Sequence, residues 1–203
     1  MKIICIGRNY IEHIKELGNS IPIEPLFFLK PETAIQPKGH PFFIPHFSND
    51  IQYEVELVIK ISKTGKHIEN KFSHKYYSQI GLGIDFTARD IQQHCRENGL
   101  PREKAKGFDG SAQISPIFIN KKDLDLGKIN FSLNKNDKQV QFGNSSDMLF
   151  NFDTIIEYIS KYITLKIGDL IYTGTPSGVG RVVEGDYLNG YIEDKEMLKV
   201  TIK

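Results

Sequence analysis

The chain of 203 residues carries 26 Lys and Arg against 25 Asp and Glu, a formal net charge of +1, so a broad nucleic-acid-binding surface is not expected. No apolar run approaches the ~20 residues that span a bilayer, and the length is sufficient for a full hydrophobic core in one domain. With only two cysteines, the chain can form neither a disulfide framework nor a cysteine metal site. The N-terminal apolar stretch is too short for a secretory signal. Together these features predict a cytoplasmic location without membrane association.

The N-terminal quarter predicts a strand, a short helix and a second strand. Residues 2–6 are apolar enough for a strand, and residues 10–17 have helical apolar spacing. Asn9 is the expected cap of this helix and Gly18 its expected end. Within the proline-rich stretch that follows, the apolar run at residues 26–29 predicts a short buried strand.

The middle of the chain predicts two longer strands and a helix. Residues 51–61 are the strongest predicted strand, because every odd position from 53 onward is apolar. Residues 80–86 predict the next strand. A helix is expected over residues 88–98, with Thr87 as its cap and Asp90 at the capping-box position.

The C-terminal half predicts mainly short strands. These are expected at residues 114–119, 128–133, 140–142 and 170–173, with one helix at residues 153–163. A glycine-rich loop follows at residues 173–180, and turns at residues 184–186 and 189–190 separate the last strands. Many short strands with about three helices indicate a β-rich α+β fold rather than a parallel α/β sheet.

Three carboxylates are candidates for a metal site. Glu54 and Glu56 lie two apart on a predicted strand, so both side chains point to the face opposite the apolar row. Asp85 shares its strand face with Gly81 and Gly83, and strand glycines often mark the close approach of a ligand or of backbone. Three oxygen donors without cysteine suit Mg²⁺ or Mn²⁺. The alternative for the glutamate pair is a solvated sheet face.

A histidine and a glutamate form a second candidate group. His13 and Glu16 are three residues apart on the first predicted helix and can share a face. A carboxylate beside an imidazole fixes its tautomer and raises its basicity, as deprotonation of water requires. The alternative is an ordinary charged surface helix. Because a loop precedes this helix, residues 8–20 are a candidate mobile lid.

The glycine-rich loop at residues 173–180 has two interpretations. Its backbone N–H groups and hydroxyls can hold an anionic oxygen. It can also be a tight turn that requires positive φ. No Lys-Ser or Lys-Thr follows, so it is not a P-loop.

Six segments, taken in order, resemble the signature motifs of the fumarylacetoacetate hydrolase family. They are Gly7-Arg8-Asn9-Tyr10, Phe28-Leu29-Lys30-Pro31, Tyr53-Glu54-Val55-Glu56-Leu57, Asp85-Phe86-Thr87-Ala88-Arg89-Asp90, Lys106-Gly107-Phe108-Asp109 and residues 173–180. The chain is most similar to the short single-domain members, the acylpyruvases and oxaloacetate decarboxylases, over nearly its whole length. It departs from related members at Gly107, where a serine is common.

The resemblance implies a mixed β-sandwich roll, a single catalytic domain over residues 1–203 and a homodimer. It implies one Mg²⁺ or Mn²⁺ per subunit, held by Glu54, Glu56 and Asp85. It places His13 and Glu16 as a catalytic dyad on the lid and Lys106 as a polar active-site group. The substrate contacts that it implies are Arg8, Lys30, Arg89, Gln92 and Thr175.

The expected activity is a metal-dependent cleavage of a C–C bond in small 2,4-dioxo or 2-oxo acids. A divalent cation beside the 2-keto oxygen stabilises the enolate charge that such a cleavage leaves. Acylpyruvate hydrolysis and oxaloacetate decarboxylation both fit this chemistry. An isomerase, a decarboxylase of aromatic-ring breakdown or a keto–enol tautomerase of the same family is an alternative, and a non-catalytic metal- or ligand-binding module is an alternative of another class.

Overall fold

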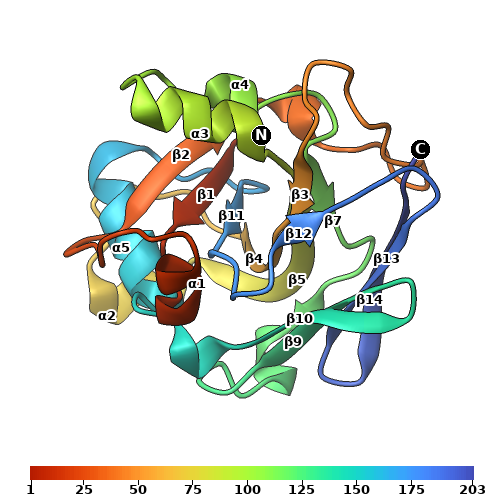
Figure 1. The fold of residues 1–203 in the computed structure, drawn as a ribbon. Helices are drawn as coiled ribbons and strands as arrows, with labels where there is room; N and C mark the ends of the chain where they lie inside the picture. Colours follow the sequence, from red (N-terminus) through yellow and green to blue (C-terminus); the bar gives the residue numbers. More distant parts are fainter.

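A mixed sheet of seven strands crosses the centre of the structure, which is a computed structural model of residues 1–203 (Figure 1). Its path runs through β2 (Leu26–Lys30), β1 (Ile3–Gly7), β11 (Leu170–Tyr172), β4 (Val55–Ile61), β5 (Tyr77–Asp85) and β7 (Ala112–Ile114), and β8 (Ile119–Asn120) also pairs with β5. Only β1 and β11 run parallel to each other. This arrangement places strands from both ends of the chain beside the central pair β4 and β5.

A second, antiparallel sheet of four strands packs against this central pair. It contains β10 (Lys138–Asn144), β9 (Asn130–Lys135), β13 (Tyr187–Ile192) and β14 (Lys195–Thr201). The two layers approach closely at Gly190, where a Cβ atom would lie 2.7 Å from the Leu82 side chain. A small third sheet joins β12 (Gly180–Arg181), β3 (Ile51–Tyr53) and β6 (Thr87–Ala88). The sheets together form a curled, half-barrel arrangement, which confirms the predicted β-rich α+β class.

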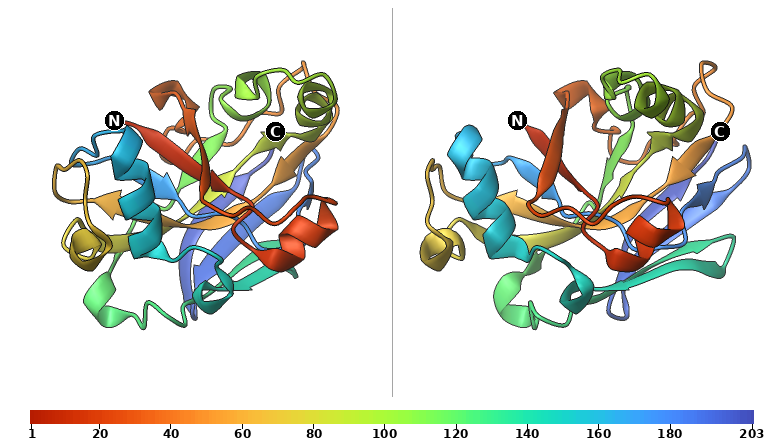
Figure 2. Two further views of the ribbon diagram at one scale, coloured as in Figure 1. Left: turned by 90° about the vertical axis from the view of Figure 1, so that its left-hand side faces the viewer. Right: turned by 60° about the vertical axis from the view of Figure 1, so that its left-hand side comes forward.

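Five short α-helices lie around the sheets (Figures 1 and 2). They are α1 (Ile11–Glu16), α2 (Asn70–Ser73), α3 (Arg89–Glu97), α4 (Glu103–Lys106) and α5 (Phe152–Tyr162), and 3₁₀ turns occur at Glu32–Ala34, Lys121–Asp123 and Ser145–Asp147. α5 buries an apolar stripe, and the Asn151 side chain accepts a hydrogen bond from Thr154 N to cap it. None of these helices has the length and apolar character needed to cross a bilayer.

The seven-stranded sheet is buried on both faces, which explains its apolar strands. The odd residues of the predicted strand at 51–61 all enter the main core, a cluster of 33 residues. The opposite face carries a smaller cluster of seven buried residues, among them Cys5, Val58 and Tyr172. Because side chains alternate across a strand, Glu56 points to this second face. The second face therefore carries the polar groups described below.

Three strand predictions and one turn prediction need correction. The strand predicted at residues 114–119 is not continuous, because β7 ends at Ile114 and β8 begins at Ile119. The strand at residues 51–61 is broken at Glu54 into β3 and β4, which pair with different neighbours. The strand at residues 26–29 exists, but Leu26 and Leu29 are exposed because β2 is the edge of its sheet. Residues 189–190 lie inside β13 rather than in a turn, because the hairpin turns after Ile192 instead.

The predicted end of the first helix at Gly18 is confirmed, since Gly18 follows the C-cap Leu17 with a φ of +60°. The predicted N-terminal caps are wrong, because the side chains concerned make long-range contacts. Asn9 is fully buried, donating to the carbonyls of Phe150 and Thr173 and accepting from Phe150 N. Thr87 lies in β6 and bonds within the candidate site. Asp90 accepts from Ser48 Oγ and from neighbouring backbone, and does not close a capping box. α1 and α3 have no side-chain cap.

A buried carboxylate stabilises the turn before β13. Asp186 is 4% exposed; it pairs with Lys135 Nζ at 2.8 Å and accepts hydrogen bonds from Asn136 Nδ2 and Val183 N. Burial by itself raises the pKa of Asp186, but these partners together hold it below its usual value. The ionised form is therefore favoured in the folded state.

Replacing this carboxylate with a neutral amide should reduce stability in a pH-dependent way. For Asp186→Asn we expect a loss of about 2 kcal/mol in the free energy of unfolding at pH 7. Because the pKa of Asp186 is lower in the folded state, its ionised carboxylate stabilises the fold at every pH above the unfolded-state pKa of ~3.9. This contribution is lost as the pH falls through the folded-state pKa. Urea titrations from pH 7 to pH 2 should show the two proteins converging, whereas the exposed Asp194→Asn control should match the parent throughout. A constant difference across this range would contradict the assignment.

Candidate metal and substrate site

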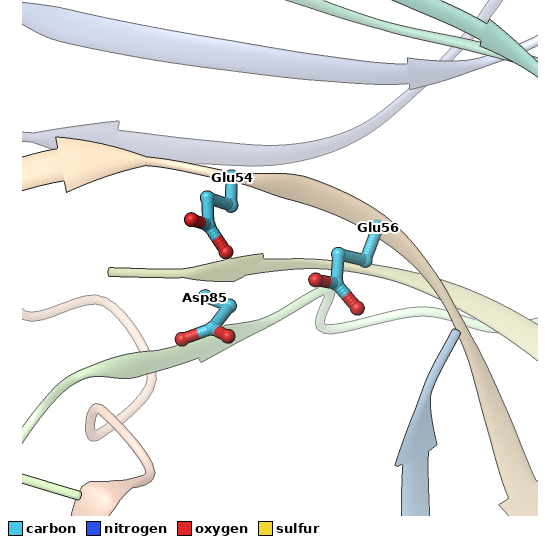
Figure 3. A group of neighbouring side chains, drawn as sticks. All are labelled: Glu54, Glu56 and Asp85. Atoms are coloured by element: carbon cyan, nitrogen blue, oxygen red, sulfur yellow. The ribbon is translucent and has the colours of Figure 1, made fainter. Parts of the chain in front are cut away.

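Three buried carboxylates from neighbouring strands meet on the second face of the central sheet (Figure 3). Glu54 lies at the break between β3 and β4, Glu56 lies on β4, and Asp85 ends β5. The ligand atoms all lie within 4.8 Å of one another, and the three residues are 5%, 2% and 1% exposed. The alternative of a solvated sheet face is therefore wrong.

Basic groups contact two of these carboxylates. Lys106 donates to Glu54 Oε2 over 2.7 Å, to Asp85 Oδ2 over 2.8 Å and to Thr87 Oγ1 over 2.6 Å. All three ammonium hydrogens are thereby used. Arg89 pairs with Glu54 Oε1. Lys106 thus holds Glu54 and Asp85 in a fixed relative position.

Glu56 has no basic partner. Its single hydrogen bond comes from the backbone N–H of Gly174, over 2.7 Å to Oε2. Burial, followed by the charges of Asp85 and Glu54, raises the pKa of Glu56 well above its ordinary value. Glu54 behaves in the opposite way: burial alone would raise its pKa, but Lys106 and Arg89 hold it well below the usual range. Glu56 is therefore the carboxylate whose charge is left uncompensated.

The residues present fit a hard divalent cation. All donors are carboxylate oxygens, the ligand type that Mg²⁺ and Mn²⁺ prefer. Asp85 is paired with Lys30 Nζ at 2.6 Å and with Lys106 Nζ at 2.8 Å, whereas Glu56 lacks a positive partner. A cation among these three side chains would compensate the charge of Glu56. This is a chemical reason for three acidic residues to be buried together.

Of the two interpretations of the strand glycines, the close approach of backbone is confirmed at Gly83, where a Cβ atom would lie 2.7 Å from the carbonyl oxygen of Gln113, and the approach of a ligand is not. A Cβ atom at Gly81 would lie 2.6 Å from the Phe118 ring, and one at Gly83 would lie 2.4 Å from the Tyr172 ring. The space beside these glycines is therefore filled by aromatic side chains and is not open to a ligand. Tyr172 also donates its hydroxyl to the carbonyl of Gln113, which fixes β11 against β7. The glycines allow close packing behind Asp85.

The predicted dyad is formed and is attached to the glycine-rich loop. His13 Nδ1 lies 2.9 Å from Glu16 Oε2, and His13 is buried at 7% exposure. The other carboxylate oxygen of Glu16 accepts from Gly178 N over 2.9 Å. With Glu16 as the acceptor, Nδ1 carries a proton, and in the neutral imidazole Nε2 is then the acceptor atom. The proposed mobility of residues 8–20 stays a prediction.

A cleft of about 460 Å³ joins these groups. It is lined by all three carboxylates, His13 and Lys106, and by four predicted substrate contacts: Arg8, Arg89, Gln92 and Thr175. Gln92 accepts from Arg89 through Oε1, so its amide N–H₂ group remains a donor. Thr175 accepts from Gln141, so its own hydroxyl hydrogen also remains a donor. The cleft thus offers donors for carboxylate or keto oxygens.

Lys30 lies behind Asp85 and does not line the cleft. Its side chain is fully buried, and its ammonium contacts Asp85 Oδ1, the hydroxyl and carbonyl of Ser111, and the carbonyl of Phe86. This position does not support the predicted substrate contact. Lys30 is instead placed to orient Asp85.

Gln141 connects the carboxylate strand to the glycine-rich loop, and no sequence motif identifies it. Its Oε1 accepts from Val55 N, between the two glutamates, and its amide donates to Thr175 Oγ1 and Pro176 O, each over 2.9 Å. A bulge in β10 lies directly before it, and bulges commonly redirect a side chain. Gln141 therefore couples the position of the glutamates to that of Thr175.

Removing this amide should weaken both stability and turnover. Gln141→Leu leaves Val55 N without a partner, for which we expect a loss of about 2 kcal/mol in the free energy of unfolding. Gln141→Glu keeps the acceptor for Val55 N but places a buried carboxylate oxygen against the carbonyl of Pro176, so it should lose at least as much stability and should also lose turnover. Chemical denaturation and steady-state kinetics check both, with the exposed Gln139→Leu on the same strand as control. Full activity in Gln141→Leu would contradict the coupling.

Two further arginines line the cleft, Arg96 and Arg102, and the sequence spacing could have indicated only Arg96. Arg96 follows Arg89 by seven residues, so both can share one face of α3. Both line the cleft, as does Arg102, which immediately precedes α4. The position of Arg102 depends on how α4 packs, which sequence spacing does not reveal.

The chain is similar to characterised proteins over almost its full length. Residues 2–203 match the family described as fumarylacetoacetate (FAA) hydrolase C-terminal. The chain is 38% identical over 201 residues to the mitochondrial oxaloacetate tautomerase of Mus musculus, which covers 99% of this chain and 91% of that protein. It is 43% identical over 188 residues to the mitochondrial oxaloacetate decarboxylase of Dictyostelium discoideum, covering 92% and 86%. The structure of fumarylpyruvate hydrolase from Pseudomonas aeruginosa in complex with Mn²⁺ and pyruvate superposes with a TM-score of 0.93 at 32% identity, covering 100% and 89%.

Proposed function

The chain belongs to the fumarylacetoacetate hydrolase family, and we propose that it is a divalent-metal-dependent enzyme that cleaves a C–C bond in small 2-oxo or 2,4-dioxo acids. The observation that carries the proposal is the uncompensated carboxylate of Glu56 beside Glu54 and Asp85 in a cleft lined by basic and hydrogen-bond-donating groups. We assign these three residues as ligands of Mg²⁺ or Mn²⁺. The relative crystallised with Mn²⁺ and pyruvate supports both the cation and the 2-oxo acid.

When bound, the cation supplies a Lewis acid that stabilises negative charge developing on the 2-keto oxygen of the substrate. The chain's own residues orient the reactant. Arg89, Gln92 and Thr175 offer donors to its carboxylate and keto oxygens, and they are fixed through Gln52, Glu54 and Gln141. Because these partners are already in place, little reorganisation is needed on binding.

The dyad supplies the base for hydrolysis. His13, held by Glu16, accepts through Nε2 a proton from the water that attacks the C4 carbonyl of an acylpyruvate. The bond between C3 and C4 then breaks, and its electron pair remains on the three-carbon fragment as the enolate of pyruvate. Lys106 uses its three donors on Glu54, Asp85 and Thr87, so its function is to orient the carboxylates.

The same site can support reactions that do not require water. Loss of CO₂ from oxaloacetate leaves the same enolate. Keto–enol tautomerisation keeps oxaloacetate intact and moves a proton between C3 and its 2-keto oxygen. Relatives named as a tautomerase and a decarboxylase favour these activities alongside hydrolysis. We therefore propose oxaloacetate and acylpyruvates as the substrates to compare.

A metal-supplemented activity screen tests the proposal. Purified protein treated with EDTA is supplied with Mg²⁺ or Mn²⁺ and assayed with acetylpyruvate, fumarylpyruvate and oxaloacetate. We expect metal-dependent turnover of at least one compound. Mg²⁺ binding by calorimetry without turnover of any 2-oxo acid would instead indicate the non-catalytic binding module.

The assembly and the location of the protein remain predictions. A homodimer and a cytoplasmic location were expected from the sequence, while the two curated relatives named above are mitochondrial. Sedimentation velocity of the full chain tests the dimer.

A further inference from the structure

The exposed end of the cleft carries three arginines without acidic partners. Arg8, Arg96 and Arg102 all line the cleft, and none of them takes part in an ion pair. Arg96 donates one hydrogen bond, over 3.2 Å to Asn19 Oδ1. The single carboxylate in the lining besides the buried three is Glu103. This end therefore carries an excess of two positive charges, because three guanidinium groups face one carboxylate.

These arginines come from three separate segments and repel one another. Arg8 follows β1, Arg96 lies on α3, and Arg102 immediately precedes α4. Burial, followed by the charges of Arg102 and Arg96, lowers the pKa of Arg8. Three like charges placed in one cleft cost free energy unless an anion offsets them. Guanidinium groups bind carboxylates through paired hydrogen bonds.

The backbone at Arg8 supports a functional reason for this cluster. Arg8 has a φ of +58°, in the left-handed region that non-glycine residues rarely adopt. Its neighbour Asn9 is fixed by hydrogen bonds to Phe150 and Thr173, so the backbone is held in this conformation. Strained residues of this kind cluster at ligand-binding sites.

An apolar wall also lines the cleft. Leu26, Phe27, Phe28 and Leu29 of β2 line the cleft that holds both the buried carboxylates and the exposed arginines. A ligand that uses the whole cleft therefore needs a polar group for the buried carboxylate site, a hydrocarbon part for the apolar wall and an anionic group for the arginines. A 2,4-dioxo acid whose acyl group ends in a second carboxylate has this pattern.

We propose that Arg8, Arg96 and Arg102 form a second anion subsite that selects acylpyruvates carrying a distal carboxylate over those with a neutral acyl tail. This inference rests on the proposed function and names its substrate class. Arg96 and Arg102 determine specificity here, and the reacting end of the substrate stays at the buried carboxylates.

The test compares two substrates that differ in the tail, fumarylpyruvate and acetylpyruvate. Arg96→Gln and Arg102→Gln should each lower the ratio of kcat/KM for fumarylpyruvate to kcat/KM for acetylpyruvate by about tenfold, the value of one hydrogen bond to a charged group. The loss should appear in KM rather than in kcat, because the contact is equal in ground and transition states. Lys104→Gln removes one positive charge from α4 outside the cleft lining and should keep the parental ratio.

A general attraction of anions would lower kcat/KM for both substrates equally, and this result would overturn the subsite. Calorimetric titration of EDTA-treated protein with the same two compounds gives a readout that does not depend on turnover. We expect the arginine variants to lose affinity for fumarylpyruvate selectively, and equal affinities in parent and variants would also overturn it. If the parent protein turns over neither compound with metal, the proposed function fails, whereas turnover with an unchanged ratio refutes the subsite alone.

Discussion

Glu56→Gln should lose metal-dependent turnover by a factor on the order of 10³ or more while the metal-free protein becomes slightly more stable. The loss of turnover reflects a Lewis-acid contribution of several kcal/mol. The gain in stability follows because the substitution removes a buried charge that faces Asp85 and Glu54 without a basic partner. Glutamine keeps an oxygen that can accept from Gly174 N.

The same chemical change at Glu54 should have the opposite effect on stability. Glu54→Gln removes the charge that pairs with Lys106 and Arg89, and both cations remain buried or half-buried without it. Breaking such pairs costs about 3 kcal/mol, which lowers the melting temperature by roughly 10 °C in a chain of this size. Both variants should lose turnover, so activity alone does not distinguish them and stability does.

Melting curves in EDTA and in excess Mg²⁺ provide the measurement. The cation should stabilise the parent increasingly with the logarithm of its free concentration above the dissociation constant, by about 2.7 kcal/mol at one hundred times that constant. Neither variant should show this shift. If both variants melted at the same temperature in EDTA, the assignment of Glu56 as the uncompensated carboxylate would be wrong. If Mg²⁺ raised the melting temperature of both variants as much as that of the parent, the three residues would be excluded as ligands.

The sequence predicted the carboxylate group because its geometry is local. Alternation along a strand puts Glu54 and Glu56 on one face, and the glycine-flanked Asp85 occupies the next strand. The pairing of Val55 with Ile84 and of Glu56 with Gly83 then brings the three together. The dyad was predictable for the same reason, since three residues separate its members on one helix.

Side chains with long-range partners were the ones misinterpreted. Asn9 and Thr87 are residue types that commonly cap helices. In the structure, Asn9 instead forms hydrogen bonds with segments about 140 and 160 residues away, and Thr87 accepts one from Lys106. The space beside Gly83, where the sequence predicts a ligand or backbone, is filled by the Tyr172 ring from a distant strand and by the carbonyl of Gln113. Gln141 acts through contacts with Val55 and the glycine-rich loop. A sequence pattern specifies neighbours along one element and does not specify what packs across it.

His13→Ala should suppress acylpyruvate hydrolysis by about 10²- to 10⁴-fold and oxaloacetate decarboxylation far less. Hydrolysis needs a base for the attacking water, whereas decarboxylation releases CO₂ without one. Glu12→Gln is the matched control, since Glu12 lies on the same helix and pairs only with exposed Lys15. Steady-state rates on acetylpyruvate and oxaloacetate at saturating Mg²⁺ give the comparison.

The attachment of Glu16 to Gly178 makes this comparison informative about α1 as well as about the base. Glu16 contacts both His13 and the loop that carries Thr175, so a displaced helix would alter substrate binding together with proton transfer. Equal losses on both substrates in His13→Ala would therefore mean that α1 acts by closing the cleft. A selective loss of hydrolysis, with KM for oxaloacetate unchanged, identifies His13 as the base and leaves decarboxylation to the buried carboxylate site.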